Sequence, residues 1–215
     1  MKNLSISLLL LLFTLSCAEN DSYSKRVLNA DTENESWLLH GRTYDESRFS
    51  PLNDINDSNV QDLGLGWSFE TGTNRGHETT PIVVDGIMFI TAPWSVVFAL
   101  DAKTGKEIWS FDPEADKDWA RNACCDVVNR GVAVWGDQVV FATIDGRLIS
   151  LDKASGLVNW DVLTIDKSKP YTITGAPRII DGKIIIGNGG GEFGFTPTKL
   201  TAVDLKINPE SFEKI

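Results

Sequence analysis

Short runs of β-branched residues recur along this chain and predict an all-β fold, namely part of a β-propeller. Each run ends in a glycine turn, a second run follows it, and an Asp and a Trp at fixed spacing close the unit. Repetition of a unit with four short strands is the sequence signature of propeller blades. We therefore expect about three blades between Trp37 and Ile215.

The two runs of each unit are expected to form the first two strands of a blade. They are rich in Val and Ile, which favour strands, and a tight turn containing Gly separates them. The first runs cover residues 81–86, 132–136 and 177–182, and the second runs cover residues 87–91, 138–143 and 183–186.

The Asp and the Trp of each unit lie eight positions apart, with a Gly between them. The two complete copies are Asp101, Gly105 and Trp109, then Asp152, Gly156 and Trp160. Asp caps a turn, and Gly supplies positive φ between the third and fourth strands. We expect the Trp to cover the joint with the next blade, and Trp67 is the same element of the first strand set. The alternative, aromatic residues of a β-sandwich core, leaves the recurring spacing unexplained.

The third copy of the unit is less regular. Asp204 is in place, but Asn208 stands where Gly is expected and Phe212 where Trp is expected. Asn is the next best residue for a left-handed turn, so the turn itself is still expected.

The first 36 residues are expected to lie outside the propeller. Residues 1–16 hold one Lys and an apolar core too short to span a bilayer, which indicates a signal peptide and export to the periplasm. Cys17 follows directly and is a candidate for lipid attachment; cleavage near Ala18 is the alternative. Residues 17–36 are polar and acidic, which predicts a tether or poorly ordered arm.

The charge of the whole chain bounds its partners. The net charge is −10 and the sequence holds no basic block. This argues against nucleic acid or an anionic membrane as the partner.

Cys124 and Cys125 are adjacent, and the residues alone leave two interpretations open. Two small buried hydrophobic residues are the commoner case. A disulfide between neighbours would join Cα atoms only ~3.8 Å apart and close almost no chain loop, so it would add little stability. Its value would instead be a flat, rigid, sulfur-rich surface.

The residues from Ala123 to Gly131 resemble the vicinal-cysteine segment of the pyrroloquinoline quinone (PQQ) dependent alcohol dehydrogenases. In that family the bridged pair lies against one face of the quinone, and an Arg five residues later contacts it. The resemblance implies these roles for Cys124, Cys125 and Arg130. It also implies an eight-bladed propeller with PQQ and Ca²⁺ on its axis, of which this chain is the N-terminal part.

Two further residues match the family in chain order. Glu78, which starts the first full repeat, would hydrogen-bond the cofactor, although a solvated loop carboxylate is the default for Glu. Thr174 would donate to a PQQ carboxylate, with Thr172 as the fallback. Without the resemblance, both Thr residues are equally well explained as β-branched strand residues.

Gly189, Gly190 and Gly191 precede Glu192 and form the second strong match. A glycine run lets the backbone approach a ligand and present its N–H groups, although a flexible hairpin tip is the simpler interpretation. The resemblance makes Glu192 a Ca²⁺ ligand, since a carboxylate oxygen suits a hard ion. In the family an Arg-Gly pair follows this motif. This chain has Phe-Thr-Pro-Thr at residues 195–198 instead, so its local backbone departs from the family pattern.

The resemblance implies an exported oxidoreductase that oxidises primary or secondary alcohols by hydride transfer to the quinone. A cytochrome c or a membrane quinone would accept the electrons, and the metal could be Ca²⁺ or a lanthanide. The family's catalytic Asp and a metal-binding Asn come from later blades, so no residue before Ile215 is expected to be the catalytic base. The competing class is a non-catalytic propeller lipoprotein, a scaffold of the cell envelope.

Overall fold

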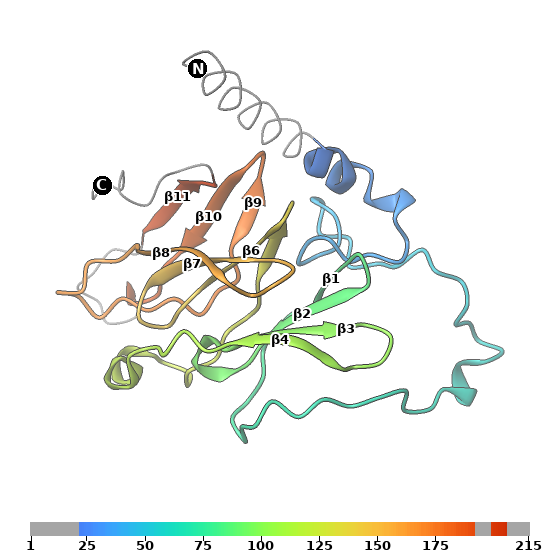
Figure 1. Ribbon diagram of the computed structural model, residues 1–215, viewed down its shortest axis with the longest axis horizontal. Coiled ribbons are helices and arrows are strands. Elements are labelled where there is room, and N and C mark those ends of the chain that lie inside the picture. Colours follow the sequence, from blue (N-terminus) through green and yellow to red (C-terminus); the bar gives the residue numbers. More distant parts are fainter. Residues whose placement is uncertain (1–21, 192–198, 206–215) are drawn as a thin grey trace, which may run out of the picture.

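Three antiparallel sheets follow one another along the chain and lie side by side, as the blades of a propeller do (Figure 1). The computed structural model describes residues 22–191 and 199–205. The first strands of neighbouring sheets are in contact with each other, as they are around the axis of a propeller. The sheets confirm the predicted all-β fold with about three blades.

Each sheet adds its strands in chain order, with β1, β5 and β9 as the first strands. The first sheet holds β1 (Ile82–Val84), β2 (Ile87–Thr91), β3 (Val97–Asp101) and β4 (Glu107–Phe111). The second holds β5 (Ala133–Trp135), β6 (Gln138–Ala142), β7 (Arg147–Asp152) and β8 (Val158–Leu163). The third holds β9 (Arg178–Ile180), β10 (Lys183–Gly187) and β11 (Leu200–Asp204). Asn208 and Phe212, at the expected fourth strand, lie outside the described residues.

Short 3₁₀ helices occur in the segment before β1 and in the connections between strands. They are η1 (Ala30–Thr32), η2 (Val60–Asp62), η3 (Pro93–Ser95) and η4 (Lys117–Asn122). Within the described part of the chain, no helix has the length and apolar character needed to cross a membrane.

The apolar faces of the sheets pack against each other and form the core. Buried residues from all three sheets, among them Phe89, Val140 and Ile184, belong to one cluster. Because each blade uses its neighbours to bury its apolar face, the blades are held at fixed positions relative to one another.

The Asp and Gly of each unit shape the turn between the third and fourth strands. The Asp101 carboxylate accepts hydrogen bonds from the Thr104 amide and hydroxyl, both at 2.7 Å, and Gly105 has φ +69°. Asp152 accepts from the Ser155 amide and hydroxyl at 2.8 and 2.6 Å. These bonds confirm the predicted turn chemistry in both copies.

Trp67 and Trp109 lie across the joints between units, as the spacing predicted. The Trp67 indole donates to the Ala102 carbonyl at 3.2 Å, in the turn of the first blade. The Trp109 indole, on β4, donates to the Lys153 carbonyl at 3.0 Å, in the turn of the second blade. The ring of Trp109 also covers Gly156, so close that a Cβ there would lie 2.7 Å from its Cδ2 atom.

The N-terminal arm differs from the expected tether. Residues 22–28 form a helix (blue in Figure 1), and the ring of Tyr23 packs 5.2 Å from that of Trp135 in the second blade. Arg26 pairs with Asp85 of the first blade at 2.8 Å. Beyond the predicted tether, Tyr44 donates to the Ile179 carbonyl of the third blade at 3.3 Å. Polar composition misled the prediction, because a few apolar and charged contacts order this part of the arm. The expected signal peptide (residues 1–16) and Cys17 lie outside the described residues.

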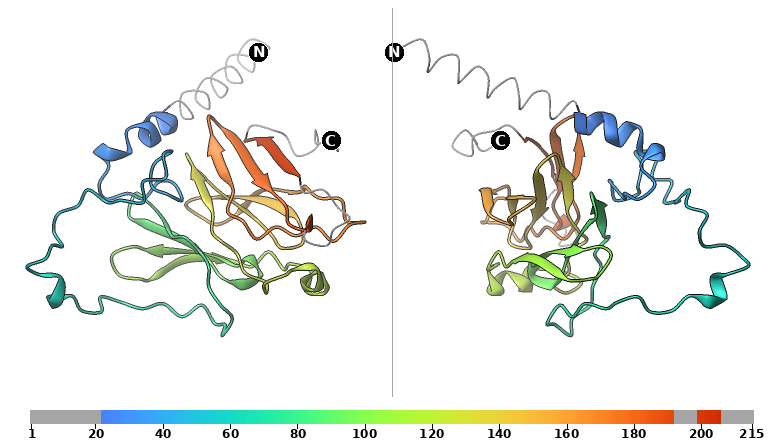
Figure 2. Two further views of the ribbon diagram at one scale, coloured as in Figure 1. Left: turned by 180° about the vertical axis from the view of Figure 1, so that it is seen from behind. Right: turned by 45° about the vertical axis from the view of Figure 1, so that its right-hand side comes forward.

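A long connection joins the arm to the first blade. Residues 49–66 loop away from the sheets in every view (Figures 1 and 2). Several large apolar residues in this segment are exposed, including Phe49 (69% exposed) and Leu65 (86% exposed).

The Trp joint allows a direct test of blade packing. We expect Gly156→Ala to lower the free energy of unfolding by about 3 kcal/mol, because the new Cβ combines left-handed strain with overpacking against Trp109. Gly136→Ala is the matched control, since Gly136 has φ +61° and nothing within 4 Å of the added Cβ. Gly136→Ala should lower the free energy of unfolding, measured with urea, by about 1 kcal/mol. Equal losses would show that the Trp joint does not hold the blades.

Candidate quinone site

The candidate site lies at one end of the first strands. Glu78 comes shortly before β1, the segment from Cys124 to Arg130 comes before β5, and Thr174 comes before β9. Since β1, β5 and β9 are neighbours, the three approaching segments meet at the same end of the blades.

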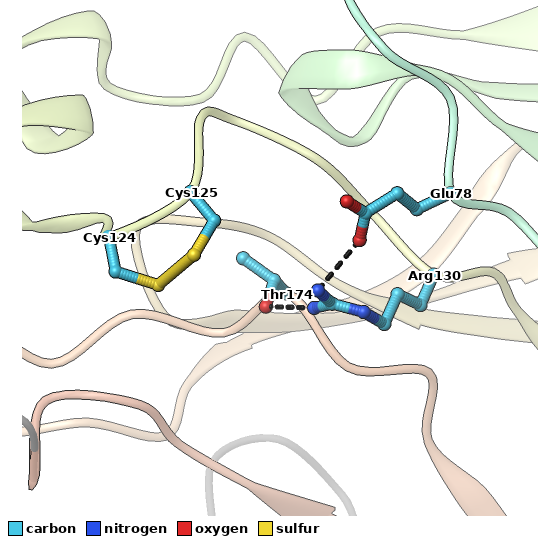
Figure 3. Close-up of a disulfide and its surroundings, with 5 residues drawn as sticks. All are labelled: Glu78, Cys124, Cys125, Arg130 and Thr174. Carbon is cyan, nitrogen blue, oxygen red and sulfur yellow. Dashed lines mark hydrogen bonds and ion pairs between the residues drawn. A yellow bond between two sulfur atoms is a disulfide. The ribbon is translucent and has the colours of Figure 1, made fainter.

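Arg130 connects the three segments through its side chain. Its Nη2 atom lies 2.6 Å from a Glu78 carboxylate oxygen, and its Nη1 atom donates to the Thr174 hydroxyl at 2.6 Å (Figure 3). The side chains of Arg130 and Glu78 are each 41% exposed, so both can also reach a ligand. The structure therefore brings together three of the residues that the sequence selected.

The backbone of Arg130 makes the same connection. Its N–H donates to the Thr174 carbonyl at 3.0 Å, and its carbonyl accepts from the Thr80 N–H at 3.1 Å. Thr172 lies differently: its side chain is buried, and its carbonyl accepts from the Gly189 N–H at 2.7 Å. Of the two Thr candidates, Thr174 is the one that faces Arg130.

Cys124 and Cys125 form a disulfide, with their Cα atoms 3.8 Å apart. Both residues are exposed, so the alternative of two buried hydrophobic side chains does not describe this pair. Figure 3 shows the disulfide beside Thr174 and the Arg130 guanidinium group. The site thus offers a flat sulfur surface next to a cation, a hydroxyl and a carboxylate.

The loop that leads to the disulfide is fixed by Asp145, which sequence reasoning did not select. Asp145 is 4% exposed; it accepts from the Asp116 amide at 3.3 Å and from the Thr143 hydroxyl, and it pairs with Arg147 at 3.4 Å. Burial alone would raise the pKa of Asp145, but the Thr143 hydrogen bond, the Arg147 charge and the Asp116 amide hold the pKa below its usual value. The Thr-Ile-Asp-Gly sequence of this turn was its only signal.

A second contact cluster, also missed from the sequence, lies on the other side of the disulfide loop. Trp94 donates from its backbone N–H to the Val127 carbonyl at 2.9 Å, and Lys117 lies 4.1 Å from the centre of its ring. Arg75 lies over the same ring and pairs with Asp126, next to the disulfide. These cation–π contacts and the ion pair tie the loop to the first blade.

The glycine run has a structural role of its own. Gly190 has φ +117°, and a Cβ there would lie 3.0 Å from the Pro170 carbonyl oxygen. The Gly189 N–H bonds to Thr172, and Gly191 is exposed. Contact of these three glycines with a cofactor stays a prediction. Glu192 lies outside the described residues, and residues 22–191 with 199–205 contain no group of three or more His, Cys, Asp or Glu side chains placed to hold a metal ion.

Comparison with known proteins defines the class. Residues 37–192 match the family model PQQ, described as the β-propeller domain of glucose/ethanol/alcohol dehydrogenases. Because the match covers most of the chain, this chain belongs to the PQQ-dependent dehydrogenase family. Its relatives include the quinohemoprotein alcohol dehydrogenase ADH-IIG of Pseudomonas putida, with 51% identity over 188 residues, 87% of this chain and 26% of that protein.

Other relatives agree with this family. A 1-butanol dehydrogenase (cytochrome c) of Thauera butanivorans is 54% identical over 159 residues, covering 74% of this chain and 23% of that protein. The solved structure of ADH-IIG has a TM-score of 0.82 at 52% identity, covering 84% of this chain and 26% of that chain. A europium-containing methanol dehydrogenase has a TM-score of 0.79 at 37% identity, covering 84% and 32%. The chain spans about a quarter of the length of the curated relatives it matches.

The buried Asp145 predicts a stability that depends on pH. Its folded pKa is depressed, so its contribution is complete above the unfolded value of about 3.9 and disappears as the pH falls through the folded pKa. We expect Asp145→Asn to cost about 1–3 kcal/mol at pH 7, because the Asp116 and Thr143 contacts lose their carboxylate. The difference from wild type in urea unfolding should shrink below pH 4. Asp137→Asn, at an exposed Asp, is the control and should change the free energy of unfolding by less than about 0.5 kcal/mol. If the stability lost in Asp145→Asn did not change with pH, the depressed pKa of Asp145 would be contradicted.

Proposed function

We propose that this chain forms one side of the quinone site of an exported dehydrogenase that oxidises alcohols and transfers a hydride to PQQ. The proposal rests on the contacts of the Arg130 guanidinium group. It lies 2.6 Å from the Glu78 carboxylate and 2.6 Å from the Thr174 hydroxyl, next to the Cys124–Cys125 disulfide. When bound, PQQ supplies the electron-accepting carbonyl chemistry that amino-acid side chains lack.

The residues present suit a planar ligand with several carboxylates. The exposed disulfide offers a wall against which a flat ring can lie. Arg130 has five N–H donors, and its contacts with Glu78 and Thr174 leave further donors for a carboxylate or a quinone oxygen. The Thr174 hydroxyl accepts from Arg130, so its own hydrogen can be donated to the ligand. Glu78 orients the guanidinium group and can accept a hydrogen bond from the ligand.

The remaining parts of the proposal concern the metal, the location and the electron acceptor. We assign Glu192 as a ligand of Ca²⁺, with a lanthanide as the alternative, because a carboxylate suits either hard cation. The europium-containing relative motivates the alternative. The apolar stretch in residues 1–16 favours export to the periplasm, with Cys17 as a possible lipid anchor. Electrons would pass to a cytochrome c or a membrane quinone, in keeping with the cytochrome c named in the butanol dehydrogenase relative.

A chimera tests the proposed function as a whole. It joins this chain, in place of the matching 26%, to the rest of Pseudomonas putida ADH-IIG. We expect it to bind PQQ in the presence of Ca²⁺ and to reduce a dye when an alcohol is added, as unaltered ADH-IIG does in parallel. A chimera that folds, as judged by circular dichroism, but binds no PQQ would overturn the proposal.

Arg130→Lys in the chimera tests the residue at the centre of the site. Lys keeps the charge but has one terminal nitrogen, whereas Arg130 contacts Glu78 and Thr174 through two separate nitrogens, so we expect PQQ to bind about 10- to 100-fold more weakly. Tryptophan fluorescence quenching measures the Kd. Arg48→Lys, at an exposed Arg that pairs with Glu46, is the control and should leave the Kd unchanged. An Arg130→Lys chimera with wild-type Kd would remove Arg130 from the quinone site.

A further inference from the structure

We propose that Thr91 and Asn129, two buried polar residues, are positioning residues that hold the backbones of Glu78 and Arg130 at a fixed separation. This inference rests on the proposed function, because the geometry it explains is that of the quinone site. Thr91 is 0% exposed and Asn129 is 2% exposed, so they act through their neighbours and not by touching a ligand.

Thr91, the last residue of β2, links the Glu78 segment to the Arg130 segment. Its N–H donates to the Thr79 hydroxyl at 2.9 Å. Its own hydroxyl oxygen lies 3.1 Å from both the Thr79 hydroxyl and the Asn129 carbonyl. Because a carbonyl oxygen only accepts, the Thr91 hydroxyl donates to Asn129. Thr79 follows Glu78 and Asn129 precedes Arg130, so a single side chain bonds to the neighbours of both site residues.

Asn129 extends this link into the second blade. Its amide nitrogen donates to the Ser95 hydroxyl at 3.0 Å and to the Ala142 carbonyl at 2.8 Å. Its amide oxygen accepts from the Gly131 N–H at 3.0 Å, on the other side of Arg130. The Asn129 side chain therefore bonds to η3 of the first blade, to β6 of the second and to the chain on the far side of Arg130.

The turn that receives Asn129 has an unusual backbone. Trp94 and Ser95 in η3 have φ values of +67° and +63°. A bulky Trp at positive φ is a true outlier, and such residues persist where the surroundings determine their conformation, often beside functional sites. Here the surroundings are the Trp94 N–H bond to Val127 and the Ser95 bond to Asn129, which both hold the disulfide segment.

This buried network explains why the exposed site keeps its shape. The ion pair between Arg130 and Glu78 is 41% exposed on both sides, and an exposed pair gains little from its own attraction. Buried hydrogen bonds are costly to break without replacement, so the Thr79, Thr91 and Asn129 bonds define the separation of the two backbones. Displacement of a binding group by about 1 Å is enough to impair a site of this kind.

Substitutions at Thr91 in the chimera test the inference. Thr91→Val keeps the shape but removes the hydroxyl, and we expect PQQ to bind on the order of tenfold more weakly. Thr91→Ser restores the hydroxyl and should return the Kd to within about twofold of wild type. If Thr91→Val does not fold, Thr79→Val removes the same link from the other side. The measurements are the PQQ Kd by fluorescence quenching and the thermal midpoint of the unliganded chimera.

Ser150→Ala is the matched control for loss of a buried hydroxyl. Ser150 is 0% exposed and bonds to Gln138 at 2.8 Å within the second blade. It should lower the thermal midpoint as Thr91→Val does, but leave the Kd unchanged. A wild-type Kd in Thr91→Val, or equal weakening in Ser150→Ala, would overturn the positioning role. Absence of PQQ binding in the unsubstituted chimera would instead overturn the proposed function, so the two failures are distinguishable.

Discussion

The hydrogen bonds of Arg130 are the interaction on which the candidate site depends. Its backbone bonds to Thr174 and to Thr80, and its side chain bonds to Thr174 and to Glu78. Arg130 and these partners together belong to segments that enter three different blades. The site is therefore a property of the packed blades, because its residues come from all three of them.

The packing of the blades is in turn set at their outer edges. Trp67 and Trp109 each lie on the turn of the next unit, and the turns are shaped by Asp101 and Asp152. These joints fix how neighbouring sheets are oriented. Because the site residues come shortly before the first strand of each sheet, the orientation of the sheets also sets the positions of the site residues. The N-terminal arm adds contacts at the opposite ends of β1 and β5, through Arg26 and Tyr23. Beyond the arm, Tyr44 contacts β9 of the third blade.

Much of this architecture could be predicted because it is encoded by local chemistry. An Asp, a Gly and a Trp at fixed spacing specify a turn and its cover, and short β-branched runs that end in a glycine turn specify strands. The missed features are nonlocal or depend on few residues. Asn129 and Thr91 are ordinary residues in the sequence, and their importance appears only when two blades meet. The helix at residues 22–28 was missed because its order comes from Trp135, more than a hundred residues later.

Charge alone would not bring an anionic quinone to this chain, whose net charge is −10. Glu78 also neutralises part of the Arg130 charge, and salt screens charges beyond about 10 Å. For the proposed quinone ligand, affinity would then come from short-range complementarity: a flat disulfide surface, a guanidinium group held in one orientation and a hydroxyl aimed by that same group. Short-range contacts of this kind require that the backbone under the site holds each side chain in a fixed position. A buried polar network below an exposed site is therefore the arrangement that this electrostatic situation requires.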